Sequence, residues 1–226
     1  MHSRRLLSPS RAARLAFCAL LLASAPALPA CQSAYYATME KFGVHKRDIL
    51  VDRVEEGRDS QQEAKKEIVD ALQAFKAVAG FEGGELESVY GKLKDRYEAS
   101  DEAVSEVKER IGAIEDVSEA LFKEWAGEID GMQDAELKRS SREMLDDTKV
   151  RAAKLIGAMK AAEGKMEPVL TKLKDHVTFL KHNLNAKAVA SLQKNLATIE
   201  TDVGALVADM EKSIAEADAF IQAMKE

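Results

Sequence analysis

The feature that most constrains the fold of this chain is an apolar seam with alternating spacings of three and four residues. A β-strand cannot produce this spacing, because strand side chains alternate with a period of two, whereas packed helices require it. The clearest seam predicts a helix over residues 86–129 and runs through Leu86, Tyr90, Leu93, Tyr97, Ser100, Val104, Val107, Ile111, Ile114, Ser118, Leu121, Trp125 and Ile129.

Three further seams share this spacing, and short breaks at residues 80–84, 131–134 and 183–185 separate the four. The first runs from Leu50 to Ala79. The third runs through Leu137, Met144, Thr148, Ala152, Leu155, Met159, Ala162, Met166, Val169, Leu173, Val177 and Leu180, and the last from Val189 to Met224. Asp134 and Asn185 have the side chains of helix N-caps.

The four seams predict an all-α fold: an elongated antiparallel four-helix bundle or coiled coil with helices of about 45 residues. The alternative is two long hairpins that complete their packing only in an oligomer. Pro168 lies inside the third seam, where a proline removes one helical hydrogen bond. Because Met166 and Val169 stay in phase across it, a kink is favoured over a chain reversal.

The first thirty residues differ in kind from the rest. Four arginines and no acidic residue precede the apolar run of residues 15–23, and small residues and prolines lead from there to Ala30. This order is typical of a cleaved export signal, and the run is shorter than the roughly 18–20 residues of a membrane-spanning helix. The alternative is an anchor helix that stays attached.

Cys31 is the predicted lipidation site. Cys18 lies inside the export signal, so Cys31 is the only cysteine after cleavage and has no disulfide partner. The preceding residues, Leu28-Pro29-Ala30, resemble a lipobox, although Pro29 departs from the usual small or hydroxyl residue. An ordinary signal peptide with a leftover cysteine is the alternative. Acyl chains would anchor the chain without a transmembrane helix.

These features predict three regions: a lipoprotein signal peptide at residues 1–30, a lipidated juxtamembrane segment at 31–47, and the helical bundle at 48–226. The residue after the cysteine is Gln32 rather than aspartate. By resemblance to lipoprotein sorting signals, this favours the outer membrane facing the periplasm over the inner membrane.

The charge balance argues against nucleic acid as a partner. Cleavage after Ala30 removes four of the 33 basic residues and none of the 39 acidic ones, which leaves a net charge of −10. Such a surface repels phosphate backbones.

Nucleophile elbows, zinc-protease motifs and phosphate-binding loops are absent from the sequence. His176 and His182 are six residues apart and cannot form an i, i+4 metal pair. We therefore expect no enzymatic activity, no metal and no cofactor, and the histidines are interpreted as surface or loop residues.

A dense polar stretch at the start of the first helix allows two interpretations. It is either a solvated first turn or a docking patch just above the membrane, close to the apolar residues Tyr35, Tyr36, Met39 and Phe42. The residues of this candidate docking patch are His45, Lys46, Arg47, Asp48, Asp52 and Arg53.

Two segments of the chain carry a family resemblance. Residues 31–36 (CQSAYY) and 44–54 (VHKRDILVDRV) resemble the start of the proteobacterial lipoprotein family catalogued as domain of unknown function 2959, and residues 180–186 (LKHNLNA) are similar to its second recurrent segment. The resemblance implies an exported, lipid-anchored, coiled-coil-rich protein. It implies no activity, cofactor or catalytic residue.

Two functions are consistent with these features. The favoured one is a non-enzymatic, lipid-anchored scaffold, spacer or adaptor in the periplasm, attached to the membrane through Cys31, with an envelope protein or a second copy as partner. The alternative is a lipid-binding or lipid-carrier protein whose helices open onto acyl chains. Pliable methionines such as Met132 and Met144 would suit that alternative.

Overall fold

The computed structural model describes residues 35–36 and 38–225, so the predicted signal peptide and Cys31 lie outside the described residues. The chain divides into two units, Met1–Val44 and His45–Glu226. In the first unit, the described part is a short helical segment that ends where Gly43 takes a positive φ of 80°. The backbone N–H of Val44 there donates to the carbonyl of Met39 at 3.1 Å.

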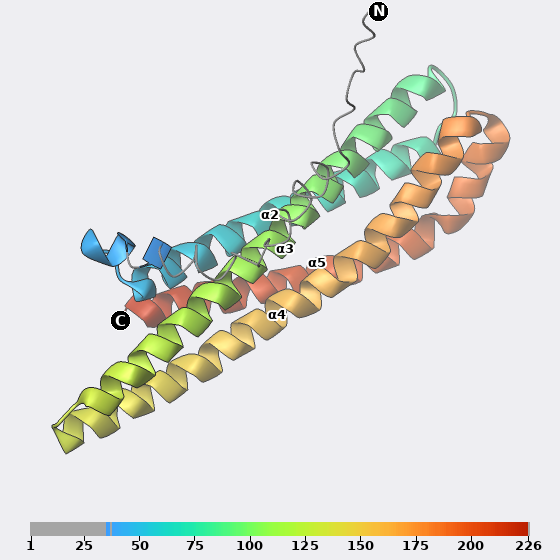
Figure 1. The fold of residues 1–226 in the computed structure, drawn as a ribbon. Helices are drawn as coiled ribbons and strands as arrows, with labels where there is room; N and C mark the ends of the chain where they lie inside the picture. The colour runs from blue at the N-terminus through green and yellow to red at the C-terminus, as the bar shows by residue number, and fades with distance from the viewer. Residues whose placement is uncertain (1–34, 37, 226) are drawn as a thin grey trace, which may run out of the picture. The chain divides into compact units, whose positions relative to one another are not determined.

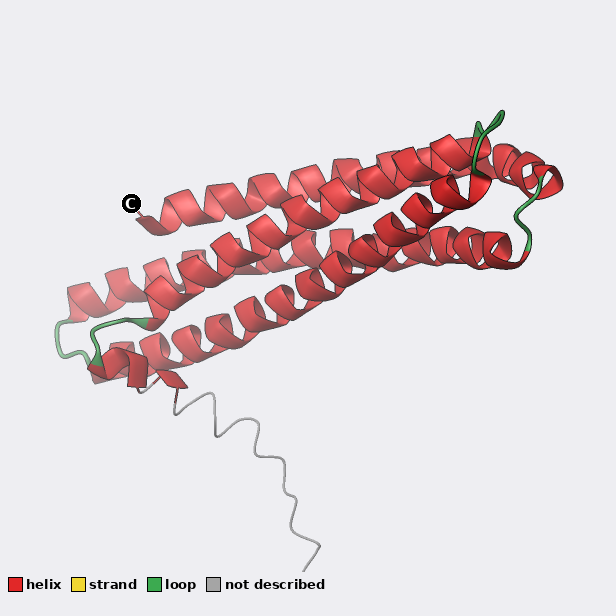
Figure 2. Ribbon diagram, turned by 90° about the horizontal axis from the view of Figure 1, so that it is seen from above, coloured by secondary structure: helices red, strands yellow, loops and turns green. Residues whose placement is uncertain are grey.

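The second unit consists of four long helices joined by short turns. They are α2 (Lys46–Ala79), α3 (Leu86–Gly131), α4 (Ala135–His182) and α5 (Ala186–Lys225), with 34, 46, 48 and 40 residues respectively. No strand occurs among residues 35–36 and 38–225 (Figure 2). The predicted all-α helical bundle is confirmed, with α2 the shortest of its four helices.

Within this unit each helix packs on the next along the chain, and α5 packs back on α2 (Figure 1). Ion pairs give the direction of neighbouring helices. Arg96 and Arg110 of α3 pair with Glu67 and Glu56 of α2, at 3.2 and 2.8 Å, so the residue numbers run in opposite directions. Similar pairs join the other neighbours, which makes the bundle antiparallel throughout.

Both N-caps predicted from the sequence are formed. The carboxylate of Asp134 accepts hydrogen bonds from the backbone N–H groups of Glu136 and Leu137, each at 2.9 Å. The side-chain oxygen of Asn185 likewise accepts from residues 187 and 188 at 3.1 Å. These bonds satisfy N–H groups that a helix start leaves without partners. The chain therefore reverses at the two polar breaks that the sequence marked.

The core of the bundle is tightest around Gly57 of α2. A methyl group placed on Gly57 would lie 2.8 Å from Cδ1 of Ile114 on α3 and 3.0 Å from Cε of Met159 on α4. Both of these side chains are fully buried. A side chain at residue 57 would have to displace the ends of these two side chains, so Gly57 leaves them room to pack over α2.

One polar pair joins α2 and α5 inside the mostly apolar core. Gln61 of α2 and Ser213 of α5 are both fully buried, and the Ser213 hydroxyl donates to Oε1 of Gln61 at 2.9 Å. Within the described part of the chain, Nε2 of Gln61 has no hydrogen-bond partner. A buried amide is costly unless it is paired, so this bond favours one alignment of α5 against α2.

α4 runs without interruption from Ala135 to His182, with Pro168 inside it. The chain does not reverse at the proline, which excludes the alternative, while a kink there stays a prediction. Met166 and Val169 remain buried on either side, so the seam keeps its phase through the missing hydrogen bond.

The α3–α4 hairpin projects beyond the ends of α2 and α5 (Figure 1). Lys46 at the start of α2 pairs with Glu124 at 3.0 Å, and Arg47 contacts Met224 at the end of α5. The part of α3 that follows Glu124 and the facing start of α4 therefore have no α2 or α5 beside them. We call residues 125–144 the α3–α4 overhang.

The overhang corrects one part of the predicted core. Leu137 and Met144 belong to the third seam, yet they are 64% and 59% exposed, while Leu145 is buried with 3% exposed. The seam keeps its register, but neither α2 nor α5 extends over its first turns. No helix among the described residues is long and apolar enough to cross a membrane.

Candidate functional site

A cavity of about 440 Å³ lies where the overhang meets the four-helix core. Its apolar part is formed by Leu121 and Trp125 of α3, Met144 of α4, and Ala223 and Met224 of α5. Nε1 of Trp125 donates to the hydroxyl of Ser141 at 2.9 Å, which fixes the indole between α3 and α4. The cavity is therefore an apolar hollow with a rigid aromatic wall.

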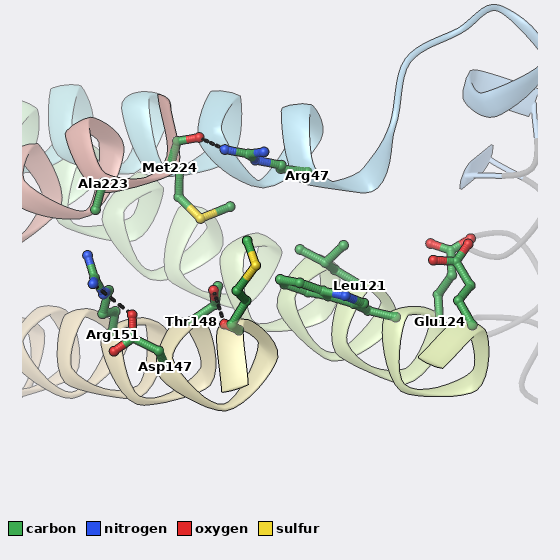
Figure 3. Close-up of a pocket in the computed structure, with 11 residues that line it drawn as sticks. Arg47, Leu121, Glu124, Asp147, Thr148, Arg151, Ala223 and Met224 are labelled. Carbon is green, nitrogen blue, oxygen red and sulfur yellow. Dashed lines mark hydrogen bonds and ion pairs between the residues drawn. The ribbon is translucent and has the colours of Figure 1, made fainter. Parts of the chain in front are cut away.

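Charged side chains surround this hollow. Figure 3 shows Arg47 directed at the end of α5, where its guanidinium donates to the carbonyl oxygen of Met224. Arg151 pairs with Asp147 on the same helix at 2.7 Å (Figure 3). A cation at the last carbonyls of a helix interacts favourably with its dipole. Arg47 thus holds the C-terminal end of α5 at the mouth of the cavity.

A second cavity of about 390 Å³ continues along α4 toward the tip of the hairpin. It is lined by Met132, Leu137 and Met144 together with polar residues from 133 to 141. Met144 lines both cavities, so they adjoin each other along α4. We call these two cavities together the α3–α4 groove.

The structure uses several residues of the candidate docking patch for packing the bundle. Lys46 bonds to Glu124 of α3 and Arg47 to the end of α5, whereas Arg53 bonds to Glu56 within α2 itself at 2.6 Å. The carboxylate of Asp48 accepts from the backbone N–H of His45 at 3.3 Å, as a helix-start residue does. Asp52 is exposed, and docking by this patch stays a prediction.

None of the described histidines lines the α3–α4 groove, and their settings differ. His45 and His182 are exposed, but His176 is half-buried, with its ring centroid 5.1 Å from that of Phe75 in an edge-on contact. The interpretation of all three as surface or loop residues therefore fails for His176. The described residues contain no group of side chains that could hold a metal ion.

Burial gives His176 a pH-dependent effect on stability. Desolvation lowers the pKa of His176 below its ordinary value of 6.5, while the negative charge of Asp175 opposes that shift. The unfolded chain therefore binds this proton more readily, so stability falls as pH drops below about 6.5. We expect His176→Phe to lose less stability than the wild type between pH 7 and pH 5, measured by urea denaturation. Equal losses would contradict this assignment.

The comparisons with known proteins give one result. Residues 35–224 match the family model described as Protein of unknown function (DUF2959). The chain belongs to this family. The match covers nearly all of the residues that the structure describes, and the DUF2959 description assigns no activity. No curated protein and no solved structure matches the chain.

For this DUF2959 member, sequence reasoning missed the α3–α4 groove. The signal was present in the lengths of the seams, because the first seam spans residues 50–79 and the second spans 86–129. Antiparallel helices joined by a short turn start at the same level, so the longer partner must project at the far end. By that argument, the apolar residues of the third seam near Met144 have neither the first nor the last helix beside them.

Proposed function

We propose that this DUF2959 protein is a non-enzymatic helical scaffold or adaptor of the bacterial envelope, exported and tethered by lipidation of Cys31. In this proposal it faces the periplasm, most simply from the outer membrane. The observation that carries the adaptor role is the α3–α4 groove, an exposed and partly apolar hollow at one end of the bundle. Exposed apolar patches of this kind typically mark interaction sites.

The state of the core favours the adaptor over a lipid carrier. Phe75, Met159 and Leu192, from α2, α4 and α5, are fully buried against the neighbouring helices. A carrier that lays its seams on acyl chains would first have to separate these contacts, and every large apolar side chain exposed again costs about 1.5–3 kcal/mol. An adaptor that binds through the groove leaves the core intact.

The anchoring part of the proposal is tested at Cys31. We expect wild-type protein in cells to incorporate radiolabelled palmitate and Cys31→Ser to incorporate none. A second variant combines Cys31→Ser with a cleavable, non-lipoprotein signal peptide in place of residues 1–30. This variant is expected in the soluble periplasmic fraction. Equal labelling of wild type and Cys31→Ser would refute lipidation at this residue.

The adaptor part is tested by photo-crosslinking in intact cells. A photoreactive amino acid at Leu137, in the groove, is expected to give a discrete adduct with an envelope protein. The same amino acid at Val150 is the matched control, because Val150 is 68% exposed on α4 but lines neither cavity. Identical adduct patterns at the two positions, or none at either, would count against an adaptor that works through the groove.

A further inference from the structure

We propose that the α3–α4 groove binds an amphipathic α-helix of a partner protein, with an apolar stripe and basic flanks. This inference rests on the proposed adaptor function and specifies the chemistry of its partner. The groove, rather than the polar start of α2, is the recognition surface in this proposal.

The rest of the bundle indicates the shape of the partner segment that would fill the groove. The seam of α4 continues in phase from Leu137 and Met144 to Leu155 and Met159, which are buried under neighbouring helices. The groove is therefore the uncovered end of a surface that accepts helices along its remaining length. A helix in such a groove contributes apolar side chains at spacings of three and four residues.

The length of the groove fits a short helix. Its lining residues on α4 extend from Leu137 to Arg151. These fourteen steps correspond to about 21 Å, or roughly four helical turns. A partner segment of about four turns would therefore cover it from end to end.

The lining side chains suit a helix that inserts apolar residues. Met132, Met144 and Met224 are unbranched and adapt to different partner shapes, which is typical of helix-binding grooves. Trp125 contributes an aromatic surface held in place by Ser141. Tryptophan is the residue type most often found at energetically dominant contacts.

The charges around the groove indicate the flanks of the partner. Its lining includes the cations Arg47 and Arg151 and four carboxylates, those of Glu124, Glu128, Asp134 and Asp147. Lys46 pairs with one of these carboxylates, that of Glu124, so one negative charge remains in excess, and it favours a partner with lysine or arginine beside its apolar stripe. The same excess disfavours a second copy of this chain, which would bring one acidic rim against another.

The chain contains an internal reporter for the test. Trp125 is its single tryptophan and lines the groove. A helix seated there would exclude water from the indole and shift its emission to shorter wavelength. The probe is a synthetic four-turn amphipathic peptide of leucine and lysine, titrated against the full chain as purified from the cell. A scrambled peptide of the same composition and a leucine–glutamate version are the comparisons.

We expect a saturable blue shift with the leucine–lysine helix, and at least about tenfold weaker binding by the scrambled peptide and by the glutamate version. Met144→Asp is expected to weaken binding at least about tenfold, whereas Val150→Asp is expected to stay within about twofold of the wild type. Both variants add one negative charge to exposed positions on α4, so the difference between them reports apolar contact in the groove.

Three results would overturn the inference. The first is equal binding of the designed and scrambled peptides, or equal losses in Met144→Asp and Val150→Asp. The second is a blue shift that grows with protein concentration alone, because the groove would then bind a second copy. The third is the same shift with phosphatidylglycerol vesicles in place of peptide, which would make the occupant a lipid. If the Leu137 crosslink persists while the peptides fail, only the helix inference falls, and the adaptor function stands.

Discussion

Replacement of Gly57 by leucine is expected to lower the free energy of unfolding by about 2 kcal/mol, the balance of about 3 kcal/mol for overpacking the core and a gain in helix propensity. The first added carbon would already lie 2.8 Å from Ile114 and 3.0 Å from Met159, and a leucine adds three more carbons beyond it. The higher helix propensity of leucine offsets only about 1 kcal/mol of this cost. Urea denaturation followed by circular dichroism measures the change.

Gly157→Leu is the matched control for this substitution. Gly157 lies inside α4 and is exposed, and no atom lies within 4 Å of the position of an added methyl group. There the gain in helix propensity is unopposed, so we expect an increase in stability of up to about 1 kcal/mol. If both variants were equally stable, the packing of Ile114 and Met159 over Gly57 would not limit the residue at that position.

Phe75→Ala is expected to destabilise the chain by about 3–5 kcal/mol, because it removes a fully buried aromatic side chain and leaves a cavity. It should also uncover His176, whose ring meets Phe75 edge-on. With less desolvation, the pKa of His176 is expected to rise toward its ordinary value. Urea denaturation gives the first effect, and an NMR titration of the histidine ring gives the second.

Phe179→Ala separates burial from residue type. Phe179 lies on α4 one turn from His176 but is exposed, so its loss is expected to cost less than about 1 kcal/mol. The same variant should leave the pKa of His176 low, because the contact with Phe75 remains. A Phe75→Ala variant with an unchanged His176 titration would show that other groups desolvate the imidazole.

Much of the fold could be predicted from the sequence because helix formation here depends on local patterns. The seams with alternating spacings of three and four residues predict the four helices, and the polar side chains of Asp134 and Asn185 predict two of the turns. Pro168 lies within an unbroken helix because the apolar phase on either side outweighs one lost hydrogen bond.

The remaining features depend on which helices face one another, and single seams do not contain that information. From the sequence alone, Gly57 is a residue of low helix propensity inside a helix. Its role in packing depends on Ile114 and Met159, whose side chains lie over it in the fold. His176 looks like a surface residue until Phe75 of another helix is placed beside it. Met144 fits a buried seam, but its exposure depends on where α2 begins and α5 ends.

The buried bond between Gln61 and Ser213 has a consequence for the distant groove. If α5 slid along α2 by one turn, about 5.4 Å, the amide and the hydroxyl would separate inside the core and each would lose its partner. The sliding would also move Met224, which forms part of the groove wall. A single hydrogen bond in the interior thus affects how much of the α3–α4 hairpin is left open, and thereby the length of the partner helix that we propose for the groove.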